Sequence, residues 1–375
     1  MIQERSLIVS EGGDRSLAKM TYHEQTDIEN TLRLREVLKT LPPFCKEFFR
    51  AIEVRTSTKT RISYAYDIRI FFEYLMTENP SLKSKSMQDL TVDILDQVKA
   101  QDLEEFEEYL KVYTSHDRLE TNGERGLKRK MSALRSFYAY FYKREQISTN
   151  PTVLVDMPKI HQKSIIRLDT DETALLLDYI EHAGDSLTGQ KKRYFEKTKE
   201  RDLALITLLL GTGIRVSECV GLDVEDLDFK NNAIIVTRKG GNQMRVYFGD
   251  EVEKALRSYL IIRESITPLA GHEHALFYST QRRRLGIQAV ENLVKKYAQA
   301  VTGSKKITPH KLRSTYGTAL YQETGDIYLV AEVLGHKDVN TTRKHYAALD
   351  DERRRKAASA VRLREEGGKR WKTPN

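Results

Sequence analysis

The sequence predicts a mainly α-helical protein of two domains with one small β-hairpin, and three observations lead to this fold class. First, the chain has 375 residues, which is enough for two compact cores. Second, apolar residues recur at helical spacing in both halves of the chain. Third, β-rich runs at 233–237 and 244–248 flank the turn Lys239-Gly240-Gly241-Asn242, which is the pattern of an antiparallel hairpin.

We expect an N-terminal extension over residues 1–43 and a helical domain over residues 44–150. The extension is polar, has weak helical patterning, and ends at Leu41-Pro42-Pro43, where the prolines break the chain. In the domain, apolar residues at helical spacing predict three amphipathic helices. Their apolar positions are Ile68, Phe71, Phe72 and Leu75; then Leu103, Phe106, Leu110 and Tyr113; then Leu127, Met131, Leu134, Tyr138 and Phe141.

The third of these helices has a basic face opposite its apolar face. That face carries Arg125, Lys128, Arg129 and Arg135. A basic linker is expected over residues 151–168, where prolines favour an extended chain and Lys159 and Lys163 add charge. Positive side chains in such groups bind nucleic-acid phosphates, but a solvated helix face or connector has the same composition. Both groups are candidate DNA contacts.

A second domain is expected over residues 169–349, followed by a C-terminal tail over 350–375. Apolar patterns predict helices at 171–183 and 202–210, with a charged insertion at 190–199 between them. The chain after residue 251 is mostly helical in pattern, and the tail keeps helical content as far as Val361.

Composition favours a partner of negative charge and a reducing compartment. The formal net charge is +8, which suits a polyanion such as nucleic acid or an anionic surface. The two cysteines, Cys45 and Cys219, form no CxxC motif or His/Cys cluster, so neither zinc nor a disulfide framework is indicated. The N-terminus lacks the apolar core of a signal peptide, and no apolar run approaches the ~18 residues of a membrane span. We expect a soluble cytoplasmic protein.

Arg215 and Lys239 are the first two candidate functional residues. Arg215 follows Gly211-Thr212-Gly213 at the end of an apolar helix, and glycines there let the chain turn sharply. An arginine at that turn can present its planar guanidinium to a phosphate. Lys239 at the hairpin tip can donate a proton. Arg238 competes for this role, but the tip position beside Gly240 favours Lys239. Taken singly, each is more often a solvated surface residue.

Two histidines, an arginine and a tyrosine complete the set. His310 and Arg313 lie at i and i+3, hence on one face of a helix whose first turn also favours an anion. His336 follows Leu334-Gly335, where a glycine is expected to end a helix. Tyr346 is one of 19 tyrosines, so only its position ten residues after His336 selects it. Each of these residues alone is weak evidence for function, but their joint order is specific.

That order resembles the tyrosine recombinase (phage integrase-like) family. The likeness covers residues from about 45 to 350, and the family pattern of Arg, Lys, His-x-x-Arg, His or Trp, and Tyr falls on Arg215, Lys239, His310, Arg313, His336 and Tyr346. Glu218 matches the acidic residue that usually supports the first arginine, whereas Ser314 stands where many relatives have a second histidine. The segments 199–204 and 238–241 are similar to Xer recombinases, especially the single-recombinase XerS type.

The resemblance implies a helical core-type DNA-binding domain, a mixed α/β catalytic domain, and a chemistry without cofactor or metal. Tyr346 would attack the scissile phosphate to give a 3′-phosphotyrosine and a free 5′-hydroxyl. The two arginines would neutralise the charge that develops on the phosphoryl oxygens. Lys239 would protonate the leaving 5′-oxygen, His310 would accept the tyrosine proton or contact the phosphate, and His336 would hydrogen-bond a non-bridging oxygen.

The resemblance also implies partners. These are duplex DNA with inverted half-sites, a homotetramer on two such sites, and an accessory DNA-bending or translocase protein; no membrane is involved. The product would be a Holliday junction, and the role would be resolution of chromosome or plasmid dimers. The tail would dock on a neighbouring protomer. Three alternatives stay open: an integrase or excisionase of a mobile element, a type IB topoisomerase-like relaxase, and a catalytically inactive DNA-binding relative.

Overall fold

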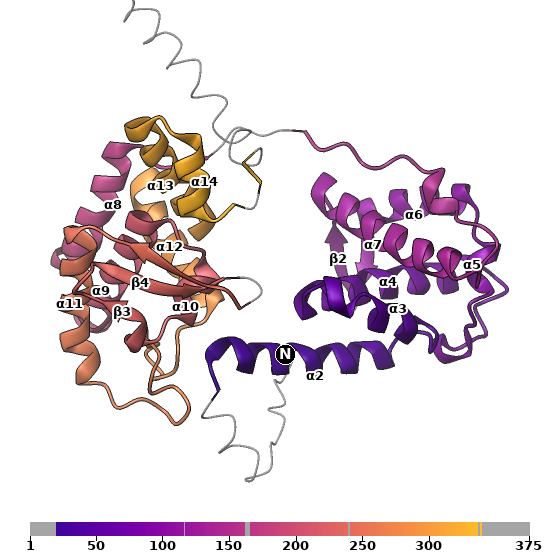
Figure 1. Ribbon diagram of the computed structural model, residues 1–375, viewed down its shortest axis with the longest axis horizontal. Helices are drawn as coiled ribbons and strands as arrows, with labels where there is room; N and C mark the ends of the chain where they lie inside the picture. Colours follow the sequence, from indigo (N-terminus) through magenta and orange to yellow (C-terminus); the bar gives the residue numbers. More distant parts are fainter. Residues whose placement is uncertain (1–19, 116, 162–165, 239–240, 337, 340–375) are drawn as a thin grey trace, which may run out of the picture. The chain divides into compact units, whose positions relative to one another are not determined.

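The computed structural model describes residues 20–115, 117–161, 166–238, 241–336 and 338–339. The chain divides into two compact units, Met1–Lys163 and Ser164–Asn375, and each is described by itself (Figure 1). The mainly helical fold class predicted from the sequence is confirmed, with two small antiparallel sheets among the described residues. None of the described helices combines the length and the apolar content that a membrane crossing requires.

The first unit is a helical bundle around an aromatic core. Its helices are α2 (Tyr22–Lys39), α3 (Cys45–Ala51), α4 (Thr58–Glu78), α5 (Ile94–Gln97), α6 (Ala100–Lys111) and α7 (Glu124–Lys143). The rings of Phe71 and Phe106 lie 5.2 Å apart in an edge-to-face arrangement, as do those of Phe48 and Phe137. This geometry suits the quadrupoles of aromatic rings and fixes how α3, α4, α6 and α7 pack together.

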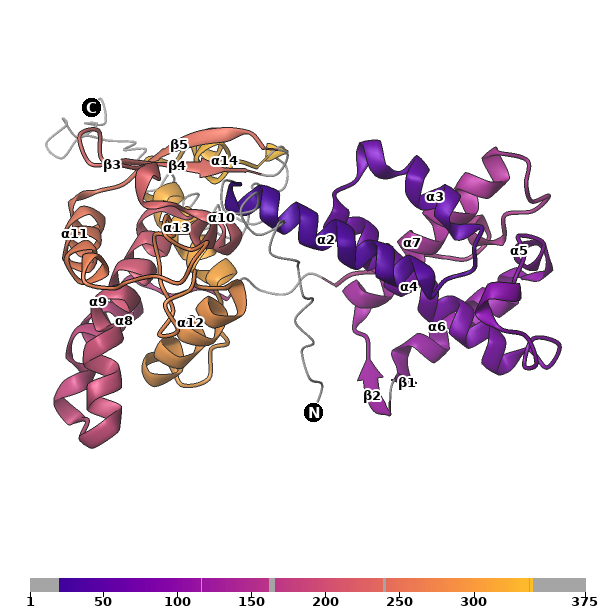
Figure 2. The same ribbon diagram turned by 90° about the horizontal axis from the view of Figure 1, so that it is seen from below.

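Helix α2 packs with the helices that follow it. It runs along α4 in both views (Figures 1 and 2), and Leu34 and Val37 are buried in the same core as the aromatic residues. Thr21 caps its N-terminus in a capping box with Glu24, which explains why the helix begins there. Residues 22–39 of the expected N-terminal extension therefore form part of this unit's packed bundle.

A β-hairpin between α6 and α7 corrects the second predicted helix. Helix α6 ends at Lys111, and Tyr113 lies on strand β1 (Val112–Ser115), which pairs antiparallel with β2 (Arg118–Thr121). The helical spacing included Tyr113 because one residue of a strand can match a helical period by chance. The β-branched and aromatic residues after Lys111 favour a strand, and Tyr113 is the one residue of β1 that is buried.

In the second unit, shorter helices pack against one long helix, α9 (Gly189–Thr212), and a three-stranded sheet packs against α10 (Val216–Gly221). The other helices of this unit are α8 (Thr170–His182), α11 (Asp250–Glu264), α12 (Ile287–Thr302), α13 (Pro309–Thr324) and α14 (Ile327–Leu334). In Figures 1 and 2, α8 and α11 lie against α9. The charged stretch 190–199 is not a separate insertion, because it forms the first half of α9.

The sheet of the second unit contains the predicted hairpin. Strands β4 (Ala233–Thr237) and β5 (Gln243–Tyr247) pair antiparallel, with Val236 opposite Met244. A short strand β3 (Leu227–Asp228), which was not predicted, pairs with β4 on its other side. Ala233, Ile234 and Val236 of β4 are buried, whereas Ile235 and Thr237 are half-buried, so packing against the rest of the unit holds this strand in place.

Candidate active site

Arg215 lies at the turn that joins α9 to α10. Gly213 ends α9 in the left-handed region at φ 62°, and a Cβ at this position would lie 2.4 Å from the ring of Tyr316. A glycine is thus needed here both for the backbone angle and for the close packing. Arg215 then caps α10. Its main-chain N–H donates to Glu218 at 2.8 Å, and its Nη1 donates to the same carboxylate at 2.7 Å. Glu218 is buried, so it holds Arg215 in a fixed direction.

His310 and Arg313 lie in the first turn of α13, as the sequence predicts, with Thr308 at the N-cap and Pro309 at the first position. The His310 side chain is exposed, whereas Arg313 is buried. The Arg313 guanidinium donates to the carbonyl of Gly213 at 2.6 Å and, by its other amino group, to the carbonyl of Leu334. A buried guanidinium that bridges two loop carbonyls joins the end of α9 to the end of α14.

The C-terminal end of α14 is the point at which these side chains meet. Gly335 ends the helix at φ 62°, and the N–H of His336 donates to the carbonyl of Ala331 at 2.9 Å, which closes the helix cap. Arg215 donates to the carbonyl of Gly335 at 3.3 Å, one residue after the Leu334 carbonyl that Arg313 binds. Both arginines are therefore directed at the same turn, next to His336.

A third arginine, Arg238, also reaches this turn. It donates to the carbonyl of Val333 at 3.0 Å, from its position just after β4. The sequence analysis set Arg238 aside in favour of Lys239 because of the tip position, and no local pattern indicates where its side chain goes. Its contact with a helix 95 residues later is visible only in the folded chain.

Two of the six candidates lie outside the described residues, namely Lys239 and Tyr346. The hairpin is described up to Arg238, whose N–H donates to the carbonyl of Asn242 at 2.8 Å. The structure therefore brings Arg215, Glu218, Arg313 and His336 together at one turn, with His310 in the same helical turn as Arg313. The roles of all six candidates remain predictions.

The candidate DNA contacts of the first unit differ in their surroundings. Arg129 is ion-paired with the buried Asp67, and Arg135 donates to the carbonyls of Thr152 and Val155 at 3.1 and 2.5 Å. These contacts give Arg135 a role in holding the segment after α7. Arg125 and Lys159 are exposed and Lys128 is half-buried, while Lys163 lies outside the described residues.

A buried charged cluster that the sequence analysis did not detect lies beneath this basic face. Lys130 is buried, lies 3.6 Å from Asp67, and donates to the Asn122 side chain at 3.1 Å. Burial raises the pKa of the Asp67 carboxyl, and the neighbouring Arg129 and Lys130 oppose this shift. A paired buried charge of this kind orients its partners, because separating the pair would leave one charge in the core.

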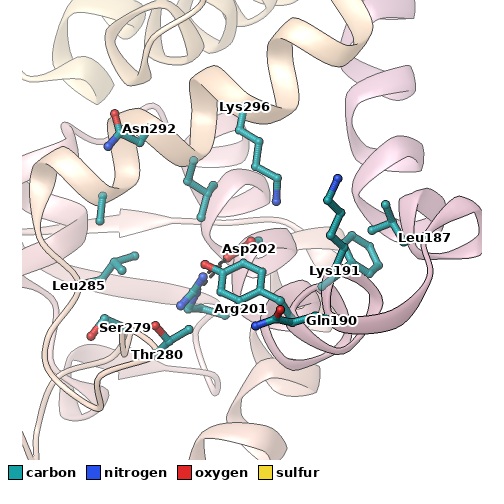
Figure 3. A pocket seen from close by; sticks show the side chains of 14 residues that line it. Leu187, Gln190, Lys191, Arg201, Asp202, Ser279, Thr280, Leu285, Asn292 and Lys296 are labelled. Atoms are coloured by element: carbon teal, nitrogen blue, oxygen red, sulfur yellow. Dashed lines mark hydrogen bonds and ion pairs between the residues drawn. The ribbon is translucent and has the colours of Figure 1, made fainter.

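A cavity of about 700 Å³ lies apart from these residues, and none of the candidates above is in its lining. Lys191 of α9 and Lys296 of α12 both line it (Figure 3). At its floor, Arg201 and Asp202 form an ion pair at 2.6 Å, and Asp202 also accepts from Tyr297 at 2.9 Å. These hydrogen bonds give Arg201 and Asp202, two residues of the 199–204 segment, a structural role.

Comparison with known proteins identifies the class. Residues 167–353 match the Phage integrase family. The chain is 33% identical over 349 residues to the tyrosine recombinase XerC of Caldanaerobacter subterraneus subsp. tengcongensis, covering 89% of this chain and 91% of that protein. It is 31% identical over 348 residues to the tyrosine recombinase XerS of Streptococcus thermophilus, covering 86% and 96%. The chain belongs to the phage integrase family of tyrosine recombinases.

Solved structures agree with this fold. The XerH recombinase in a post-cleavage complex with palindromic difH matches with a TM-score of 0.61 at 23% identity, over 81% of this chain and 80% of that one. A lambda integrase dimer bound to a COC′ core site matches with a TM-score of 0.57 at 16% identity, over 89% and 98%. Within its family, this chain is a site-specific recombinase of the Xer type, which cleaves and rejoins DNA.

Proposed function

We propose that this recombinase exchanges strands between two duplex sites through a 3′-phosphotyrosine at Tyr346 and a Holliday junction. One observation carries the proposal: Arg215 and Arg313, from two separate helices, converge on the C-terminal turn of α14 beside His336. Two guanidinium groups held at one point supply the positive charge that a pentacoordinate phosphate requires. Their carbonyl partners are weaker acceptors than a phosphate, so a phosphate oxygen can replace them.

The roles of the remaining residues follow from the chemistry of the step. The Tyr346 oxygen attacks phosphorus, the bond from phosphorus to the 5′-oxygen breaks, and the leaving oxygen takes a proton from Lys239. His310 accepts the tyrosine proton or contacts the phosphate, and His336 hydrogen-bonds a non-bridging oxygen. Because the two arginines stabilise the developing charge, the step requires no metal or other cofactor.

The substrate that we propose is duplex DNA with inverted half-sites, bound by four protomers on two sites. The XerH and lambda integrase structures were solved on DNA sites, and the similar curated relatives carry Xer names. We therefore propose resolution of chromosome or plasmid dimers as the cellular role, in the cytoplasm, with an accessory DNA-bending or translocase protein. In the first unit, Arg125, Lys128 and Lys159 are our candidates for phosphate contacts.

The experiment that tests this function uses sites selected by the protein from random-sequence duplex DNA. Two such duplexes, incubated with the protein, should give Holliday junctions and then recombinant products, with each cut 3′ end attached covalently to protein. Relaxation of supercoiled plasmid without any junction would favour a topoisomerase-like relaxase instead. Cutting without a covalent adduct would contradict the phosphotyrosine step.

The tail outside the described residues gives a second expectation. Residues 350–361 follow Tyr346 closely and include alanines at 357, 358 and 360, so we propose that they pack on the neighbouring protomer. Truncation after Leu349 should leave binding of one protomer to a half-site nearly unchanged, because that binding involves no second protomer. Cooperative filling of the second half-site and recombination should fall, since DNA-bound protomers meet at high effective concentration. Gel-shift titration on half- and full sites measures both, and equal cooperativity with and without the tail would show that the tail does not couple protomers.

A further inference from the structure

The Arg238 side chain makes two contacts with the end of α14: a hydrogen bond to a carbonyl and close packing over Gly335. Its Nη2 donates to the carbonyl of Val333 at 3.0 Å. A Cβ added at Gly335 would lie 1.7 Å from the Arg238 Nη1, so any residue with a side chain would displace the guanidinium. Gly335 therefore serves two purposes: it adopts the left-handed helix end at φ 62°, and it makes room for Arg238.

The main chain of Arg238 closes the described end of the hairpin. Its N–H donates to the carbonyl of Asn242 at 2.8 Å, and its carbonyl accepts from Gly241 at 3.0 Å. One residue is thus fixed to the sheet by its backbone and to α14 by its side chain. The residue that follows it in the sequence is Lys239, and the residue that follows Gly335 is His336.

The position of Arg238 is electrostatically unfavourable. Burial lowers the pKa of its guanidinium, the Glu218 carboxylate opposes this shift, and the charge of Arg215 adds to it. Within the described part of the chain, its buried Nε has no hydrogen-bond partner. A cation placed beside another cation, with one donor unsatisfied, destabilises the folded state, and such departures from local rules are expected at functional sites.

We propose that Arg238 is a positioning residue, which braces the base of the hairpin against the end of α14 so that Lys239 can protonate the leaving 5′-oxygen. This inference rests on the proposed role of Lys239 as the general acid. Arg238 acts through Lys239 and does not itself touch the reacting atoms. Arg215 and Arg313 bind carbonyls of the same turn. The end of α14 therefore fixes the position of the hairpin base relative to the two arginines that we propose to bind the phosphate.

The test replaces the 5′-bridging oxygen of the scissile phosphate with sulfur. A thiol has a pKa of about 8.5, far below that of an alcohol, so a thiolate leaves without a proton donor. On ordinary DNA, Arg238→Met should cleave about 10- to 100-fold more slowly, a part of what a general acid contributes. On the sulfur substrate, its rate should come within about 3-fold of wild type, because proton donation no longer limits the step. Arg238→Lys keeps the charge but loses the planar fork, so it should show a smaller defect and the same rescue.

Two further variants, Lys239→Ala and Arg257→Met, show whether a negative result contradicts the proposed role of Lys239 or that of Arg238. Lys239→Ala should be slow on ordinary DNA and rescued by sulfur; if it is not rescued, Lys239 is not the acid, and the proposed role of that residue fails. If Lys239→Ala is rescued but Arg238→Met and Arg238→Lys are equally slow on both substrates, Arg238 does not act through Lys239 and this inference is overturned. Arg257→Met, which removes an arginine paired with Glu253 on α11, is the matched control and should cleave both substrates like wild type.

Discussion

Replacing Tyr346 with phenylalanine should abolish the covalent protein–DNA adduct completely and leave DNA binding unchanged. Phenylalanine keeps the ring and loses only the hydroxyl oxygen, which is the atom that would form the bond to phosphorus. A duplex nicked close to the scissile phosphate loses a short fragment after cleavage, so the adduct accumulates and can be counted on a denaturing gel. Gel-shift titration of the same duplex measures binding separately.

Tyr316 provides the matched control for this change. Its ring packs against Gly213, and burial raises the pKa of its hydroxyl, so it is a poor nucleophile near neutral pH. Tyr316→Phe preserves that packing and should form the adduct at the wild-type rate. An adduct formed by Tyr346→Phe would mean that another tyrosine attacks, and peptide mapping of the DNA-linked fragment would identify it.

Local sequence patterns predicted most helices because each needs only its own residues. The apolar spacing of α4 and α7 and the Thr308-Pro309 start of α13 are signals of this kind. The β1–β2 hairpin and strand β3 were missed because their four- and two-residue strands are too short to establish a period. The start of α9 was missed because its first turns are charged, and its apolar stripe becomes clear only after residue 202.

The candidate site was predicted as an ordered set of residues, whereas its geometry could not be predicted. The contacts of Arg313 with Gly213 and of Arg215 with Gly335 join residues 100 and 120 positions apart. No local pattern encodes such separations. The buried Asp67–Lys130 pair was missed for a related reason, since an acidic residue on one helix and a lysine on another look like surface charges until their faces meet.

Removing either of the two arginines that we propose to bind the scissile phosphate should give the second large effect. Arg215→Ala and Arg313→Ala should each slow cleavage by about 100-fold or more, the usual loss when one preorganised contact to developing charge is removed. The lysine variants should recover only part of this, because an ammonium cannot reproduce the planar fork. Single-turnover cleavage of the nicked duplex at saturating protein measures the chemical step, and Arg257→Met is again the control.

The Arg215→Ala and Arg313→Ala variants should differ in their free energy of unfolding. This difference separates an effect on folding from an effect on the chemical step. Arg313 is buried, and its loss leaves the carbonyls of Gly213 and Leu334 without their donor, at about 1–3 kcal/mol for each group. The Arg215 side chain is 42% exposed, and Glu218 would still accept from the main chain at that position, so Arg215→Ala should unfold closer to wild type. Both variants should nevertheless lose cleavage to a similar degree below their melting temperatures. Wild-type cleavage should also persist in EDTA, because in the proposed mechanism the guanidinium groups supply the charge that a metal would otherwise provide. Loss of cleavage in EDTA, with recovery on adding magnesium, would overturn that account of the chemistry, as would an Arg215→Ala variant that cleaves at the wild-type rate.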